Sequence, residues 1–193
     1  MKSAFPKVLH RAGGTRLIDR VLSTASSLSP QIVICVVGHQ AKELVAALSG
    51  HIGLIFVVQE PQLGTGHALL MTEPALAGAR GTVVLLSGDV PLLTAKTLKT
   101  LVDHHTATGS SVTVLTAVVE NPHGYGRIVR IGGRIARVVE ERDATRAERA
   151  IREINSGIYA FELEGLFDAL RQIATENAQG EYYLPDLVAI FSA

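Results

Sequence analysis

The sequence has little of what membrane proteins, secreted proteins and polyanion-binding proteins need. It contains one cysteine and no tryptophan among 193 residues, and 18 basic residues are balanced by 18 acidic ones. A chain without net charge has no broad field to attract nucleic acids or anionic membranes, so we expect neither as a partner. No apolar run is long enough to span a bilayer, and none follows a basic N-terminus as a secretory signal would. These absences favour a cytoplasmic protein that meets any polyanion at one local site.

The single cysteine, Cys35, favours the same compartment. It lies in the apolar run 32–37, where an unpaired cysteine behaves as a small hydrophobic residue. We expect a buried structural thiol and no disulfide, which suits a reducing cytoplasm.

What the sequence does contain is 47% hydrophobic residues, enough for one substantial core in a single domain over 1–193. In the first part, short β-branched apolar runs alternate with helical patterns. This alternation is typical of βαβ units, with a mostly parallel sheet and helices on both faces. The expected elements are strands over 31–37, 54–59 and 82–86, helices over 15–28, 41–48 and 95–106, a helix opening near Thr65, and an N-cap at Thr94.

The pattern changes after residue 110. Strand patterns cover 111–119 and 158–161, and 163–174 has the periodicity of an amphipathic helix. Gly132-Gly133 indicates a hairpin between 126–131 and 134–140. The predicted fold class is therefore α/β, with a Rossmann-like half followed by a more antiparallel half on the substrate side.

Ligands of open α/β sheets bind beyond the carboxyl ends of the strands, which singles out two loops. In loop 59–67, Gly64 and Gly66 allow a close approach of the backbone to a ligand. The helix that follows would present free amides to a phosphate or a base edge. A Gly-Thr-Gly sequence is as often a plain tight turn, so this loop alone is a weak signal.

The second loop, 86–92, places Asp89 directly after an apolar strand, with Gly88 before it and Pro91 after it. A carboxylate held in this way suits a hard cation such as Mg²⁺, which prefers one or two carboxylates plus substrate phosphates. It suits equally well an aspartate that only caps the following turn. The spacing does not decide between the two.

Later strand ends offer further polar residues. Those in 122–128, 140–143 and 153–158 are candidates for hydrogen bonds to sugar hydroxyls, although most of 141–152 is expected to be a solvated charged face. The pair His104-His105 has no metal-ligand partner nearby and is expected at the exposed end of a helix. The sequence has no Ser/His/Asp elbow, zinc-ligand cluster or Walker motif. Covalent catalysis is therefore unsupported, whereas metal-assisted displacement at phosphorus remains open.

Eight motifs in order resemble one family, the uridyltransferase domain of the bacterial bifunctional N-acetylglucosamine-1-phosphate uridyltransferase and glucosamine-1-phosphate acetyltransferase. The resemblance spans nearly the whole chain and implies the Rossmann-like nucleotide-diphospho-sugar transferase fold. The motifs are Pro6-Lys7-Val8-Leu9-His10, residues 59–67, Gly88-Asp89-Val90-Pro91-Leu92, Gly124-Tyr125-Gly126-Arg127-Ile128, Val139-Glu140, Asp143-Ala144-Thr145, Glu153-Ile154-Asn155-Ser156-Gly157-Ile158 and Gln179-Gly180-Glu181-Tyr182-Tyr183-Leu184-Pro185-Asp186.

The resemblance implies two catalytic residues. Lys7 would neutralise the phosphate charge that develops during transfer, and Asp89 would hold Mg²⁺, the implied cofactor, between the phosphates. The implied substrate-binding residues contact the nucleotide or the sugar. They are Gln59, Gly64 and Thr65 for uracil, Gly88 beside the metal carboxylate, and Gly126, Glu140 and Asn155 for the N-acetylglucosamine moiety.

The implied reaction is in-line attack of N-acetylglucosamine-1-phosphate on the α-phosphorus of UTP. It yields pyrophosphate and UDP-N-acetylglucosamine, a precursor of peptidoglycan and the cell wall. Such a transfer needs charge neutralisation and alignment more than a protein nucleophile. Two alternatives stay open: a transferase for another sugar-1-phosphate or base, and a truncated or degenerate relative that binds a nucleotide sugar without turnover.

The sequence also departs from the family pattern. A first strand and a glycine-rich loop are expected ahead of Pro6, and Met1-Lys2-Ser3 matches only the end of that loop. Ser87 stands where a tyrosine is expected, and neither the asparagine expected as second metal ligand nor the acetyltransferase β-helix is in the sequence. We expect either a start placed at an internal methionine or a genuine short form, monomeric or weakly dimeric. Strands beside the missing one should have unpaired edges.

Overall fold

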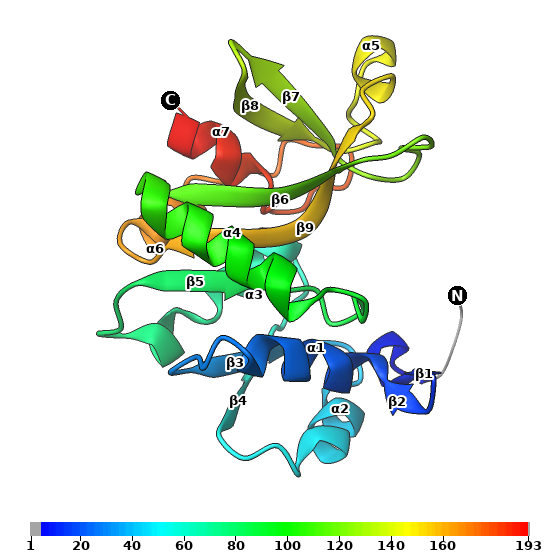
Figure 1. The fold of residues 1–193 in the computed structure, drawn as a ribbon, viewed down its shortest axis with the longest axis vertical. Coiled ribbons are helices and arrows are strands. Elements are labelled where there is room, and N and C mark those ends of the chain that lie inside the picture. Colours follow the sequence, from blue (N-terminus) through cyan, green and yellow to red (C-terminus); the bar gives the residue numbers. More distant parts are fainter. Residues whose placement is uncertain (1–4, 193) are drawn as a thin grey trace.

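The computed structural model describes residues 5–192 (Figure 1), so the expected match of Met1 to Ser3 with a family loop lies outside the described residues. The first part of the chain alternates strands and helices, as the sequence predicts. Its elements are η1 (Lys7–Leu9), β1 (Arg11–Ala12), β2 (Thr15–Arg16), α1 (Leu17–Ser26), β3 (Val33–Val37), α2 (Ala41–Leu48), β4 (Leu54–Val58), α3 (Thr65–Leu70), η2 (Glu73–Leu76), β5 (Thr82–Leu85) and α4 (Ala95–Thr108).

The second part is richer in antiparallel strands. Its elements are β6 (Val112–Val118), β7 (Arg127–Ile131), β8 (Arg134–Val139), α5 (Arg146–Arg149), β9 (Glu153–Glu162), α6 (Leu166–Leu170) and α7 (Asp186–Ser192). The hairpin of β7 and β8 turns at Gly132 and Gly133, both with positive φ, as expected. The predicted N-cap of α4 is also confirmed, since the Thr94 hydroxyl accepts a hydrogen bond from the Thr97 amide at 3.1 Å.

Two larger sheets make up the α/β fold. Strands β3 and β4 pair in parallel, whereas β5, β6 and β7 each pair antiparallel with β9, and β8 pairs with β7. Within residues 5–192, parallel pairing is confined to β3 and β4, so the antiparallel part is larger than the sequence pattern indicated. Local periodicity predicts strands, but their partners depend on contacts distant in sequence.

Strands β3 and β5 each lie at an edge of their sheet within the described part of the chain. Helix α1 and the residues after it connect the two sheets. Leu22 packs in the cluster that contains Cys35 of β3, and Leu28 packs in the cluster that contains Val84 of β5. Cys35 is partly exposed instead of buried, which corrects the expectation from its apolar run.

Strand β9 is the centre of the core because its side chains alternate between two helical layers. Ile158 and Ala160 pack against α4, whereas Tyr159 and Phe161 pack against α3, α6 and α7 on the other face. Tyr159, Ala160 and Phe161 are at most 1% exposed. The arrangement confirms helices on both faces, and Figure 1 shows α4 and α7 on either side of β6 and β9.

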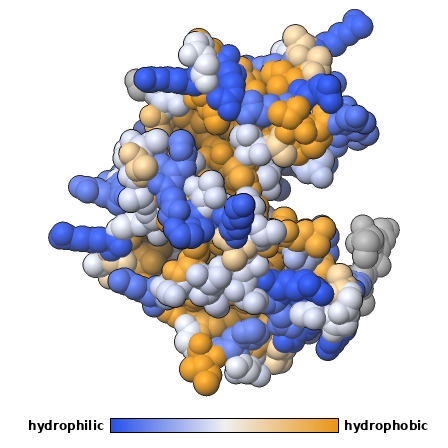
Figure 2. Space-filling view, in the orientation of Figure 1, coloured by the Kyte–Doolittle hydropathy of each residue, from blue (hydrophilic) through white to orange (hydrophobic). Residues whose placement is uncertain are grey.

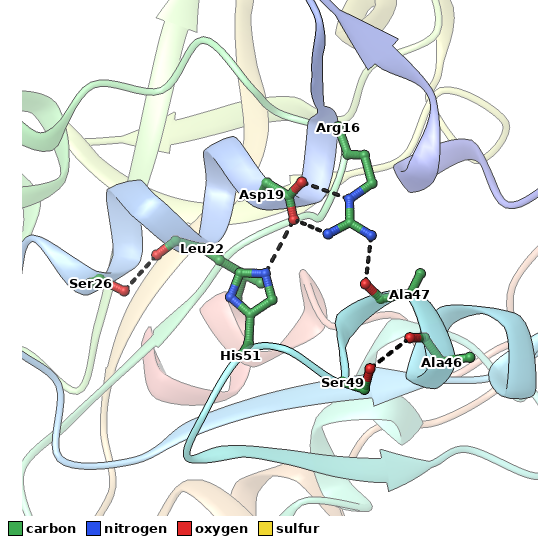
Figure 3. Close-up of polar contacts among 8 residues, drawn as sticks. All are labelled: Arg16, Asp19, Leu22, Ser26, Ala46, Ala47, Ser49 and His51. Carbon is green, nitrogen blue, oxygen red and sulfur yellow. Dashed lines mark hydrogen bonds and ion pairs between the residues drawn. The ribbon is translucent and has the colours of Figure 1, made fainter.

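A polar cluster fixes the start of α1 against the end of α2 (Figure 3). Arg16 donates two hydrogen bonds to the Asp19 carboxylate, at 2.6 and 2.8 Å, and a third to the Ala47 carbonyl at 2.5 Å. His51 Nε2 lies 3.2 Å from the same carboxylate. The hydrogen bond from Arg16 is the main reason that the pKa of Asp19 is lowered. The cluster anchors the end of α2 beside α1.

Three predicted helices or helix ends need correction. Residues 15–16 belong to a short hairpin with 11–12 instead of a helix, because Gly13 and Gly14 turn the chain with positive φ. The helix expected over 163–174 is only α6, because Gly165 adopts a positive φ at its N-cap. His105 is 2% exposed, and its Nδ1 lies 2.9 Å from the Thr113 hydroxyl, so it does not lie at an exposed helix end.

The strand expected over 158–161 is also longer than predicted, because β9 begins at Glu153. The first half of β9 contains polar residues, so its sequence lacks the apolar pattern that predicts a strand. The Ser156 hydroxyl donates to the Leu115 carbonyl at 2.6 Å, and the Asn155 side-chain oxygen accepts from the Gly157 amide at 3.0 Å. These polar side chains are satisfied by the strand's own surroundings.

The exposed surface is mixed in character. Figure 2 shows hydrophilic side chains projecting from much of one face, with apolar residues exposed between them. Among residues 5–192, none of the helices has the length and apolar character that crossing a bilayer requires.

Candidate functional site

The two residues predicted to carry the chemistry are in contact. Lys7 Nζ, in η1, lies 2.5 Å from Asp89 Oδ2, which follows β5. The hydrogen bond and the charge of Asp89 raise the pKa of Lys7, so its ammonium group stays charged at neutral pH. The side chains are 70% and 31% exposed, so both remain open to a ligand.

Gly88 is needed where this pair forms. A Cβ atom at Gly88 would lie 3.1 Å from side-chain atoms of Val8 and Ile18. The absence of a side chain therefore lets the turn after β5 lie against η1 and α1, which places Asp89 within reach of Lys7.

Asp89 alone does not form a metal cage. No group of three or more His, Cys, Asp and Glu able to hold a metal ion occurs in the described ranges. Magnesium usually takes one or two carboxylates and completes its coordination with water and substrate phosphates. An exposed single carboxylate beside a cation fits a half-site of this kind, in which phosphate oxygens supply the remaining ligands.

The three residues predicted to bind the sugar are also brought together: Glu140 directly follows β8, Asn155 is in β9, and Gly126 directly precedes β7. The backbone N–H of Asn155 donates to the Gly126 carbonyl at 2.9 Å. A Cβ atom at Gly126 would lie 3.0 Å from Glu140 Oε1, so only glycine lets this carboxylate approach the backbone without displacement. The register of Arg127 opposite both Val139 and Ile154 fixes this arrangement.

Beside this group lies a cleft of about 330 Å³. It is lined by residues of three loops, namely Gly124, Glu140, Glu141, Arg142, Gln179 and Tyr183. Burial raises the pKa of Glu140, and the neighbouring charges of Asp143 and Asp186 raise it further. The cleft has the concave, polar character that a hydroxyl-rich ligand needs.

The two groups share one end of the sheet. Because β5 and β9 are antiparallel, with Leu85 opposite Tyr159, the residues that follow β5 lie beside the first half of β9. A Cβ atom at Gly157 would lie 3.6 Å from Ser87 Oγ. The turn with Asp89 and the strand start with Asn155 are therefore adjacent.

The third predicted set, Gln59, Gly64 and Thr65, lies in a loop held to residues 181–184. The Gly66 amide donates to the Tyr182 carbonyl at 2.8 Å, and the Thr65 hydroxyl accepts from the Leu184 amide at 3.1 Å. Gln59 Nε2 donates to the Gly64 carbonyl at 2.9 Å. The loop is thus a fixed feature, and the Thr65 hydroxyl keeps its own proton for donation.

Sequence reasoning missed a buried cation. Arg127 is 1% exposed, and its guanidinium group donates to the Tyr125 carbonyl and, at 2.6 Å, to the Glu141 carboxylate. These contacts hold the turn before β7 against the end of β8. Arg127 belongs to a recognisable motif, but nothing local in the sequence distinguishes a buried arginine from an exposed one.

The fold occurs in solved nucleotidyltransferase structures. A UDP-glucose pyrophosphorylase complexed with UDP-glucose has a TM-score of 0.79 at 18% identity, covering 97% of this chain and 79% of that one. A putative glucose-1-phosphate thymidylyltransferase from Bacillus anthracis, in complex with a sucrose, has a TM-score of 0.78 at 17% identity, with 96% and 73% covered. At these identities the likeness establishes the fold class.

The family follows from sequence comparison. The model of the MobA-like NTP transferase domain matches residues 1–158, and the chain belongs to this family of nucleotidyltransferases. It is 45% identical over 194 residues to the bifunctional protein GlmU of Streptococcus equi subsp. zooepidemicus, covering 100% of this chain and 42% of the relative. It is 44% identical over 192 residues to GlmU of Streptococcus suis, with 99% and 41% covered. The chain thus spans about two fifths of these relatives, and the resemblance carried by the motifs is confirmed.

The close approach at Gly64 generates a stability prediction. Gly64 has φ 106° and ψ 177°, a conformation almost confined to glycine, and a Cβ atom there would lie 2.7 Å from the Tyr182 carbonyl oxygen. We expect Gly64→Ala to lower the free energy of unfolding by about 3 kcal/mol, measured by urea denaturation. Gly78→Ala, at φ 77° with nothing within 4 Å, is the control and should cost only about 1 kcal/mol. Equal losses would mean that the approach to Tyr182 is unimportant.

The pKa shifts of two adjacent glutamates predict opposite pH effects. The raised pKa of Glu140 means that stability is lost as pH rises from about 4.3, the ordinary glutamate value, through the folded-state pKa. Hydrogen bonding to Arg127 lowers the pKa of Glu141, so its stabilisation is present above pH 4.3 and lost as pH falls through its folded-state value. At pH 7, Glu140→Gln should raise the melting temperature by a few degrees, and Glu141→Gln should lower it.

Thermal melts of both variants between pH 3.5 and 7.5 check this. The gap between Glu140→Gln and the parent protein should widen as pH rises and close near pH 3.5. A constant gap across the range would show that the charge of Glu140 does not cause the difference.

Proposed function

We propose that this chain transfers the uridylyl group of UTP to N-acetylglucosamine-1-phosphate, releasing pyrophosphate. The identity to GlmU proteins over the whole chain supports this substrate pair. The observation that carries the proposal is the adjacency of two groups at one end of the sheet. One is the Lys7–Asp89 pair, suited to phosphates, and the other is Gly126, Glu140 and Asn155, suited to a sugar.

In this proposal each group of residues has a separate task. The loop at Gln59, Gly64 and Thr65 binds the base. The cleft lined by Glu140, together with the neighbouring Asn155, positions the sugar so that its phosphate faces the nucleotide. Asp89 would hold Mg²⁺, and the bound ion would supply charge neutralisation for the phosphates. Gly88 keeps Asp89 against η1 for this purpose.

The proposed bond changes occur at the α-phosphorus of UTP. A phosphate oxygen of N-acetylglucosamine-1-phosphate attacks it, the new P–O bond forms, and the bond to the bridging oxygen of the β-phosphate breaks. Pyrophosphate leaves with that electron pair. Lys7, kept cationic by its contact with Asp89, is placed to stabilise the negative charge on the oxygens during this exchange. Alignment and charge neutralisation are then the protein's whole contribution, consistent with the lack of a candidate nucleophile.

The test is pyrophosphate release from purified protein given UTP, N-acetylglucosamine-1-phosphate and Mg²⁺. Release should require all three, with glucose-1-phosphate a poor substitute. We expect Asp89→Asn to lower kcat/KM by about 100-fold or more with an unchanged fold. The matched control is Asp103→Asn, which removes an exposed carboxylate that pairs only with Lys99 on α4 and should leave the rate unaltered.

A rate insensitive to Asp89→Asn would contradict the assignment of the metal ligand. Absence of release from folded protein that still binds UDP-N-acetylglucosamine would contradict turnover, and would support a nucleotide-sugar binder instead.

A further inference from the structure

The side chain of Gln59 is held by two acceptors on one side. Its Nε2 atom lies 2.9 Å from the Gly64 carbonyl oxygen and 3.1 Å from His67 Nδ1. A carbonyl oxygen can only accept, so the amide atom facing Gly64 must be the nitrogen. The Gly64 carbonyl therefore favours this orientation of the amide, and His67 Nδ1 is the second acceptor that supports it.

The same geometry fixes the state of His67. A hydrogen bond from Gln59 Nε2 to Nδ1 requires Nδ1 to be the unprotonated nitrogen, which assigns the ring proton to Nε2. The ring is half-buried at the first turn of α3 and lies 6.3 Å from the Tyr182 ring, tilted by 34°. Residues 181–184 are bonded to Thr65 and Gly66 of the same turn.

With both N–H groups of Gln59 engaged, Oε1 is the only part of the amide left to meet a ligand. A flipped amide would turn Oε1 toward the Gly64 carbonyl oxygen, which can only accept, and in the Nε2-protonated tautomer of His67 it would also face the Nδ1 lone pair. Unsatisfied contacts of this kind are unfavourable, so the observed orientation is preferred.

We infer that His67 is a positioning residue that makes Gln59 present an acceptor to the nucleobase, and that it thereby selects bases with a donor at this edge. Uracil has such a donor, its N3–H group, whereas N3 of cytosine is an acceptor and would face Oε1 with repulsion. The inference rests on the proposed function, in which loop 59–67 binds the base, and it assigns the cause of base selectivity to a residue that does not itself contact the base.

The test compares the Kd values of UTP and CTP, measured by titration calorimetry with Mg²⁺ present. The parent protein should prefer UTP by about tenfold or more. His67→Phe keeps a ring against Tyr182 but removes the acceptor, so the ratio should fall below about threefold. His67→Asn places an oxygen near the position of Nδ1 and should keep most of the preference. An unchanged ratio in His67→Phe, or its loss in both variants, would overturn the inference.

Gln59→Leu separates this inference from the proposed function. If that variant keeps the UTP preference, Gln59 does not read the base and the proposed base site is wrong. If it loses the preference while His67→Phe keeps it, only the positioning role of His67 is wrong.

A measurement on the unaltered protein does not depend on the folding of any variant. The ¹⁵N chemical shifts of the His67 ring should show a protonated Nε2 and an unprotonated Nδ1 at neutral pH. A protonated Nδ1 would overturn the inference, because that nitrogen could not then accept a hydrogen bond from Gln59.

Discussion

The pairing of β9 with β5, β6 and β7 is the constraint on which the core and the candidate site both depend. The second half of β9 directs apolar side chains alternately to two helical layers, and Ala160 and Phe161 are fully buried. Its first half carries Asn155, with its backbone bonded to Gly126. The turn after β5, with Asp89, is held beside this half by the antiparallel register. The buried pairs at one end of the strand therefore set the distance between the proposed phosphate and sugar positions at the other.

Glycine is needed at the points where these elements meet. At Gly64 a side chain would collide with the Tyr182 carbonyl. At Gly126 and Gly88 a Cβ atom would be in tight contact with the Glu140 carboxylate and with Val8 and Ile18, respectively. At each of these glycines, a backbone segment or a charged side chain lies next to a residue that is proposed to contact a substrate. The partly buried Glu140 is disfavoured as an anion and lowers the stability of the fold in that form. This is typical of residues kept for binding instead of folding.

Much of the fold could be predicted from local signals. The apolar runs, the Thr94 cap and the Gly132-Gly133 turn predicted elements that the structure contains. The motifs also singled out Lys7 and Asp89, which lie 82 residues apart in sequence and form an ion pair in the structure. The strand partners of β9 and the buried state of His105 depend on distant contacts, which periodicity does not report. The roles proposed for the site residues remain predictions.

The central claim is that one nucleotide sugar binds across the loops at the strand ends, with its base at Gln59 and its sugar at Glu140 and Asn155. A crystal structure of the protein with UDP-N-acetylglucosamine tests it most directly. The account predicts uracil N3 within about 3 Å of Gln59 Oε1, and sugar hydroxyl or amide groups within about 3 Å of Glu140 and Asn155. A ligand bound elsewhere, or a base that contacts Gln59 through Nε2, would contradict it.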